Sequence, residues 1–269
     1  MILIAASKLD RAALNIAKNL LEISRLKNID QTFSGEPVYS GGNLTLIYVD
    51  VDSVDAKDLD KHFKPEGIVF ASRHSSETKE PTLTVHVPGN LLSDARFGGN
   101  PSEVAIAWPE RMSRALTTLD VLKSELNTEY KVSLEATHHG PTAMSVPVWF
   151  VEIGSSEKQW NDHEAGNVVA QAILKSTEET SAKPYVGFGG GHYAPKHTKM
   201  CLEEGMAVGH IVPKHAVNEV QADAFRQLFD KTRGNCSSAL LDWKGLSGPQ
   251  RAKIMTMLDD CGISDIIKA

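Results

Sequence analysis

The chain has 269 residues, of which 41% are hydrophobic and 23% are charged. This composition is typical of a globular protein and excludes a disordered, collagen-like or coiled-coil chain. Lys and Arg number 28 against 34 Asp and Glu, so the formal net charge is −6. That balance argues against a generally basic nucleic-acid-binding protein, although it allows a local basic patch.

Cysteine usage and the N-terminal sequence bear on the compartment. The three cysteines are widely spaced and form no CxxC pair, which is typical of a reducing environment. The first residues form a short apolar run without a basic segment before it, and no stretch approaches the ~20 apolar residues of a membrane span. We therefore expect a cytoplasmic protein that does not enter a membrane.

Apolar periodicity predicts strands and helices along the whole chain. A strand over 1–6 leads into a helix that begins at Ser7 and ends near Leu26. The acidic segment 50–60 is predicted as a solvated loop, because it lacks the glycine and final glutamate of a calcium loop. The other expected strands are 44–49, 67–71, 83–87, 131–137, 146–153, 184–188, 207–212 and 239–243. The other expected helices are 103–126 with a kink or late start at Pro109, 160–175, 217–229, and a last helix from Ser247.

This alternation predicts an α/β fold: a single three-layer domain over residues 1–269 with a mixed, mostly parallel sheet. Only about seven residues join the expected strands 131–137 and 146–153, whereas a parallel crossover needs a dozen or more. We therefore expect these two strands to run antiparallel, which makes the sheet mixed.

The sequence Glu135-Ala-Thr-His-His-Gly-Pro141 places two histidines side by side at the end of a predicted strand. On a regular strand Glu135 and His139 share one face while His138 takes the other. Both histidines therefore reach one ion only if the strand end is irregular. The alternative is a pair of structural histidines.

A second motif, PYVGFGGGHYAPKH, covers residues 184–197. Gly189, Gly190 and Gly191 allow close approach of the backbone to a ligand and can direct N–H groups at an anion or oxyanion. His192 follows directly. Neither a Walker loop nor GxGxxG is present, so the motif does not indicate nucleotide-phosphate binding. A tight turn with a surface histidine is the alternative.

Two further strand ends carry polar side chains. Glu152 ends an apolar strand, where a carboxylate can orient a histidine or act as a general base. Arg73 and His74 follow another strand among serines, a setting that suits a phosphate or carboxylate ligand. A structural ion pair and an ordinary surface loop are the respective alternatives. The mid-strand His86 is interpreted as structural.

In this order, the motifs SRHSSE followed by LTVHVPGN, EATHHGP, VEIGSSEKQW and GFGGGHYAPKHT resemble the archaeal-type D-aminoacyl-tRNA deacylases, which also occur in plants. The resemblance runs from the MILIAAS start to the last helix. It implies a cytosolic, monomeric, zinc-dependent enzyme that hydrolyses the ester between a D-amino acid and tRNA. It also implies a fold similar to peptidyl-tRNA hydrolase and nucleoside-phosphorylase-like proteins.

Ester hydrolysis needs an activated water and donors for the oxyanion. We expect the catalytic residues to be His138, His139 and His192. The substrate-binding candidates are Arg73, His74, Gly189, Gly190, Gly191, Lys196 and Lys199, the lysines serving tRNA phosphates. The candidate zinc ligands are His138, His139, Glu152, His192 and His197, and a metal-free histidine mechanism remains an equal alternative. A nucleoside or phosphate-ester hydrolase or phosphorylase, and a non-catalytic RNA- or nucleotide-binding protein, are the other functions considered.

Overall fold

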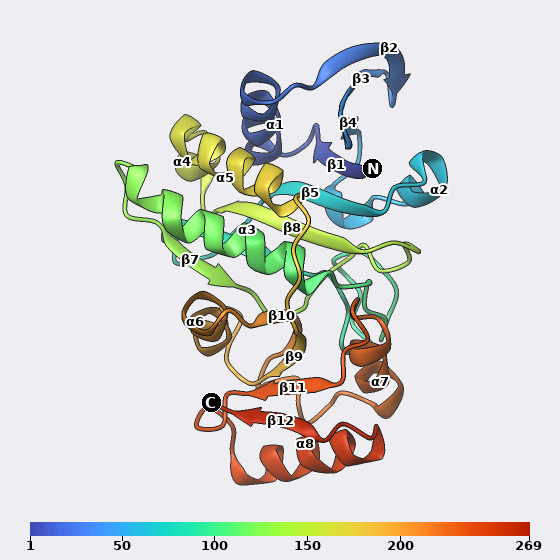
Figure 1. Ribbon diagram of the computed structural model, residues 1–269, viewed down its shortest axis with the longest axis vertical. Coiled ribbons are helices and arrows are strands. Elements are labelled where there is room, and N and C mark those ends of the chain that lie inside the picture. The colour runs from blue at the N-terminus through green and yellow to red at the C-terminus, as the bar shows by residue number, and fades with distance from the viewer.

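Two sheets organise the protein in a computed structural model that describes residues 1–269 (Figure 1). The larger sheet has the order β2 (Lys27–Phe33), β3 (Glu36–Gly41), β4 (Leu44–Val49), β1 (Ile2–Ser7), β5 (Gly67–Arg73), β8 (Val148–Gly154), β6 (Thr82–His86), β7 (Lys131–Leu134). The smaller sheet has the order β10 (Ala207–Val212), β9 (Pro184–Phe188), β11 (Ser238–Leu241), β12 (Asp265–Lys268).

Strand directions confirm the α/β class with a mixed, mostly parallel sheet. The smaller sheet is wholly parallel, and β1 pairs in parallel with both β4 and β5. Antiparallel pairs occur at the β2–β3–β4 edge and between β6 and β8. The strands flanking residues 140–145, β7 and β8, do run in opposite directions, but β6 lies between them. The second sheet is an addition to the expected architecture.

Helices pack on the sheets and form two hydrophobic core clusters with them. They are α1 (Arg11–Ile23), α2 (Leu59–Phe63), α3 (Pro109–Leu122), α4 (Glu157–Trp160), α5 (His163–Ser176), α6 (Pro195–Glu204), α7 (Ala222–Asp230) and α8 (Gly248–Asp260). In Figure 1, α1, α3, α4 and α5 lie in front of the larger sheet. The larger cluster combines Phe70 and Trp149 of that sheet with Val208 and Leu240 of the smaller one. One domain over 1–269 stays a prediction.

Local signals place several element ends. Asp10, rather than Ser7, caps α1, because its carboxylate accepts the N–H groups of Ala12 and Ala13 at 2.8 and 3.1 Å. The last helix begins after Ser247, as predicted, with a complete capping box. Pro109 occupies the first turn of α3, so this helix has the late start that its position allows.

Other elements differ from the expectation. The β2–β3 hairpin, α6 and β12 were not expected, and the acidic segment holds a short 3₁₀ turn and the start of α2 instead of only a loop. β7 ends at Leu134, three residues before the predicted end. None of the helices combines the length and apolar character that crossing a bilayer requires.

Candidate functional site

Histidine and glutamate side chains from distant segments meet beside β5, β6 and β8. We call this group the His–Glu cluster. Its members are His74, His86, Glu135, His138, His139, Glu152 and His192. His74 follows β5, His86 ends β6, Glu152 belongs to β8, and His192 lies in the glycine-rich loop after β9. The remaining members occupy the segment after β7.

Sheet register brings the side chains of His74, His86 and Glu152 together. Glu152 of the central strand β8 lies opposite Ser72 on β5 and Thr84 on β6. His74 and His86 are each two residues further along, which returns them to the same face as Glu152. Its Oε2 atom accordingly lies 3.7 Å from both His74 Nδ1 and His86 Nε2.

Glu135 is fully buried at the centre of the cluster. An isolated antiparallel bridge to Tyr193 and the hydrogen bond from Ala136 N–H to the His192 carbonyl (2.8 Å) bring the glycine-rich loop beside it. Its carboxylate oxygens lie 3.0 Å from His192 Nε2, 3.1 Å from His74 Nδ1 and 3.5 Å from His138 Nε2. Burial opposes ionisation, but the His192 contact and the surrounding histidines outweigh it and hold the pKa of Glu135 well below its usual range.

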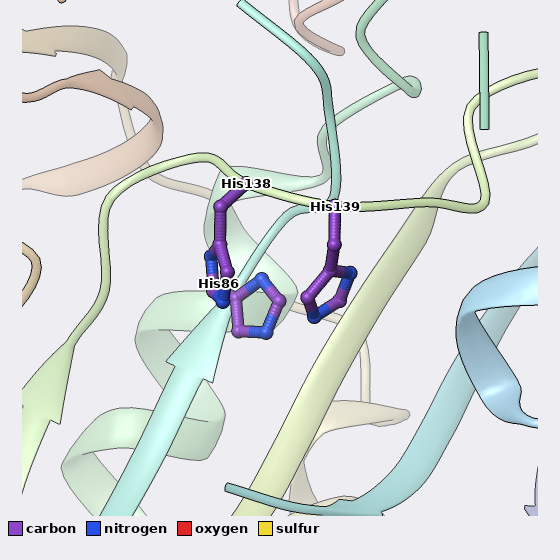
Figure 2. A group of neighbouring side chains, drawn as sticks. All are labelled: His86, His138 and His139. Carbon is purple, nitrogen blue, oxygen red and sulfur yellow. The ribbon is translucent and has the colours of Figure 1, made fainter. Parts of the chain in front are cut away.

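The adjacent His138 and His139 point into one space, because the chain leaves the strand before them. His139 has a φ of +46°, and the two ring centroids are 4.3 Å apart. Figure 2 shows both rings beside that of His86. Each Nδ1 lies near a backbone carbonyl: that of Ala136 at 2.8 Å for His138, and that of Gly140 at 2.6 Å for His139. A carbonyl only accepts, so both Nδ1 atoms carry the proton and both Nε2 atoms keep their lone pairs.

The environment keeps these two rings neutral. Burial, together with the charge that neighbouring histidines would carry, lowers the pKa of His138 well below its usual range. Burial and then His86 lower the pKa of His139 to about 3. A neutral imidazole with a free lone pair is the form that accepts a proton from water or binds a metal ion.

His86 is the third ring of Figure 2 and is fully buried. Neither ring nitrogen has a hydrogen-bond partner, although the ring stacks on Phe150 with centroids 5.0 Å apart. A buried, unpaired polar group is costly. Burial opposes a charge on this ring, yet Glu152 and Glu135 outweigh it and raise its pKa.

The same three rings fit a metal ion. Ligand atoms of His86, His138 and His139 lie within 4.8 Å of one another, and two further groups combine His74, Glu135 and His192, or His86, Glu135 and Glu152. Three imidazoles and an open position are a common ligand set for catalytic zinc. The sequence alone supports only a structural interpretation of His86, because a single histidine in an apolar strand carries no spacing signal; its place beside His138 and His139 makes it a candidate ligand as well.

The structure places the other expected site residues as follows. Arg73 donates to the Leu9 carbonyl at 3.1 Å and to Asp52 at 3.2 Å, close to His74. His197 lies outside the cluster: it is buried against Gly187, with Nε2 3.3 Å from the Leu240 carbonyl. It therefore shares no ion with the other candidate ligands.

The remaining candidates for substrate binding are the glycine run and two lysines. The N–H of Gly189 donates to the Val212 carbonyl at 2.9 Å, whereas those of Gly190 and Gly191 donate to no protein group. Lys196 and Lys199 lie on α6, and Lys199 Nζ is 3.5 Å from a Glu203 oxygen. Only the last two glycines of the run therefore keep a free N–H for a ligand.

Two cavities flank the cluster. One of about 560 Å³ is lined by Arg73, His74 and Glu152, together with two aspartates and three serines: Asp10, Asp52, Ser53, Ser72 and Ser75. The other, of about 310 Å³, lies toward residues 89–94 and 213–216. The residues shared by both cavities are Phe97, His138, His139 and His192. Phe97 was not anticipated, since an isolated aromatic in a polar segment gives no sequence signal.

Imidazoles around a buried carboxylate, with cavities on both sides, define a candidate hydrolytic site on an α/β fold. The sequence profile of the family described as D-aminoacyl-tRNA deacylase matches residues 61–266. The chain belongs to this family.

Similar proteins extend the match to the whole chain. A D-aminoacyl-tRNA deacylase of Thermococcus onnurineus is 38% identical over 99% of each chain, and one of Pyrococcus abyssi is 37% identical over the same shares. One of Methanosarcina mazei is 37% identical over 97% of this chain and 90% of its own. A crystal structure titled as a conserved protein of unknown function aligns with a TM-score of 0.91 and 29% identity, over 100% of this chain and 95% of that one.

Proposed function

We propose that this protein hydrolyses the ester that joins a D-amino acid to the 3′ end of tRNA. The family and its full-length relatives support this function over the phosphorylase and non-catalytic alternatives. The observation that carries the proposal is the orientation of His138 and His139. Their Nδ1 atoms lie beside backbone carbonyls, which leaves Nε2 as the basic atom of each ring, and both residues line the two cavities.

The reaction that we propose uses this chain's own groups. The Nε2 of His138 or His139 accepts a proton from a water molecule, whose oxygen bonds to the ester carbonyl carbon. The bond from that carbon to the ribose oxygen then breaks, and the ribose oxygen takes up the proton. Free D-amino acid and tRNA result. Free N–H groups of Gly190 and Gly191 serve as candidate oxyanion donors.

The alternative to this metal-free reaction has zinc as cofactor, held by His86, His138 and His139, with Glu152 and Glu135 beside them, and then the Nε2 atoms of His138 and His139 would bind the metal instead of the proton. Bound there, it would supply a water of lowered pKa and polarise the carbonyl. In either version Glu135 holds His192 and His74 in place, and the exposed edge of His192 faces the substrate. We further propose that Lys196 and Lys199 contact tRNA phosphates. A monomeric, cytoplasmic protein stays a prediction.

The test is a deacylation assay with D-tyrosyl-tRNA and L-tyrosyl-tRNA, each measured with and without the purified protein. We expect release of D-tyrosine well above the spontaneous rate, and little acceleration with the L-ester. Equal acceleration of both esters would contradict the D-specificity. No acceleration of either would contradict the proposed reaction.

A further inference from the structure

Phe97 is a large apolar side chain held in solvent next to the His–Glu cluster. It is 67% exposed, the highest value among the exposed large hydrophobic residues of this chain. Its carbonyl accepts a hydrogen bond from Gly140 N–H at 3.0 Å, directly after His139. At this place, beside both cavities, the exposed ring offers a face on which a planar ligand group can stack.

The backbone around Phe97 is fixed. The Asn90 side chain donates to the carbonyls of Gly98 and Asn100 at 2.8 and 3.1 Å. Gly98 has a φ of +79° and packs so closely on the Val54 carbonyl that a side chain would clash. The loop therefore presents the ring from a rigid support.

The two cavities that share Phe97 differ in chemistry. The larger one contains the carboxylates of Asp10, Asp52 and Glu152 and one guanidinium, that of Arg73, which pairs with Asp52 at 3.2 Å. Three carboxylates against one guanidinium favour an ammonium group over a phosphate. The smaller one has a mixed wall, with Leu91, Leu92, Pro213 and Ala216 beside histidines, and its single aspartate, Asp94, is paired with Arg96 at 2.6 Å.

Exposed Lys214 and His215 lie at the smaller cavity, where His215 lines the wall. The Lys214 N–H is bound to the Gly190 carbonyl at 3.0 Å, which ties this segment to the glycine-rich loop. A lysine next to a cavity that offers both apolar and imidazole walls suits a nucleotide whose base enters the cavity and whose phosphate remains outside.

We propose that the smaller cavity binds the 3′-terminal adenosine of tRNA, with the adenine stacked on Phe97. The inference rests on the proposed function. An aminoacyl-adenosine ester has an ammonium on one side of its carbonyl and a purine nucleoside on the other. With the nucleoside in the smaller cavity and the amino group near Asp52 and Glu152, the carbonyl lies at the histidines that both cavities share.

The experiment compares Phe97→Ala and Phe97→Trp with the control Val121→Ala, a 65% exposed residue of α3 away from the cluster. Calorimetry measures binding of adenosine 5′-monophosphate, and kinetics are measured with D-alanyl-tRNA and D-tyrosyl-tRNA. Base–aromatic stacking predicts that Phe97→Ala weakens nucleotide binding and raises KM roughly tenfold for both substrates. Phe97→Trp, which keeps a π-face, and Val121→Ala retain wild-type values.

Unchanged nucleotide affinity and KM in Phe97→Ala would overturn the adenosine site while normal turnover leaves the proposed function intact. A KM loss much larger for D-tyrosyl-tRNA than for D-alanyl-tRNA would also overturn it, because Phe97 would then contact the amino acid. Nucleotide binding that depends on Phe97, in a protein that hydrolyses no aminoacyl-tRNA, would support the adenosine site and contradict the proposed function.

Discussion

His192 Nε2 lies 3.0 Å from a carboxylate oxygen of Glu135, and this contact joins the glycine-rich loop to the segment after β7. Both carboxylate oxygens are buried, and their close contacts are with the imidazole nitrogens of His192, His74 and His138. The contact between Glu135 and His192 therefore positions the glycine-rich loop relative to the segment that carries His138 and His139.

Glu135→Gln is expected to lower kcat on D-tyrosyl-tRNA by about 100-fold, a typical effect of disturbing acid–base groups. The amide keeps the shape of the side chain but removes the charge that orients His192 and His74. A purely structural role predicts instead a change in melting temperature with an unaltered pH–rate profile. Circular dichroism and the pH profile of kcat separate the two results.

Metal binding is expected to depend on His86. Protein purified without chelator should contain about one zinc ion per chain, and His86→Ala should lose most of it. The matched control is His163→Ala, because His163 is exposed at the start of α5 and contacts Glu22, which is not a member of the cluster. Elemental analysis measures the content. If wild-type protein keeps full activity after exhaustive chelation, with metal measured as absent, catalytic zinc is contradicted and the metal-free histidine mechanism is supported.

Acid is expected to destabilise the metal-free protein from pH 6.5 downward. His139 is neutral when folded until about pH 3, whereas the unfolded chain binds a proton near pH 6.5. The unfolded state therefore binds more protons, and each pH unit of acidification costs up to ~1.4 kcal/mol of the free energy of unfolding from this residue.

His139→Gln should flatten this dependence, measured by urea unfolding between pH 6.5 and 4.5, whereas His163→Ala should not. The Glu135 carboxylate, whose pKa is lowered on folding, adds a loss of stability only below its unfolded value near 4.5. A wild-type slope in His139→Gln would show that the ring does not titrate in this way.

Binding of tRNA is expected to weaken steeply with salt, because phosphate contacts release counterions. Lys196→Ala and Lys199→Ala should raise KM more than they lower kcat. Lys61→Ala is the control, since Lys61 is exposed on α2 and paired with Asp58. Filter binding at several salt concentrations measures the slope, and an affinity independent of salt would point to a small-molecule substrate.

Sequence patterns predicted most of the fold because strands such as 184–188 and the capping box at Ser247 depend on local signals. The β2–β3 hairpin escaped prediction, since its mostly exposed residues carry no apolar alternation. Spacing argued against His138 and His139 sharing a ligand, but the positive φ of His139 reverses that argument. The roles suggested for His86 and Phe97 depend on sheet register and loop anchoring, which single motifs do not encode.

The most direct test of the central claim compares kcat for D-tyrosyl-tRNA in wild-type protein, His138→Ala and His163→Ala. The account predicts that His138→Ala loses at least about 100-fold in kcat, with little change in tRNA affinity, while His163→Ala keeps wild-type turnover. A folded His138→Ala protein with wild-type kcat would contradict the claim that this cluster performs the hydrolysis.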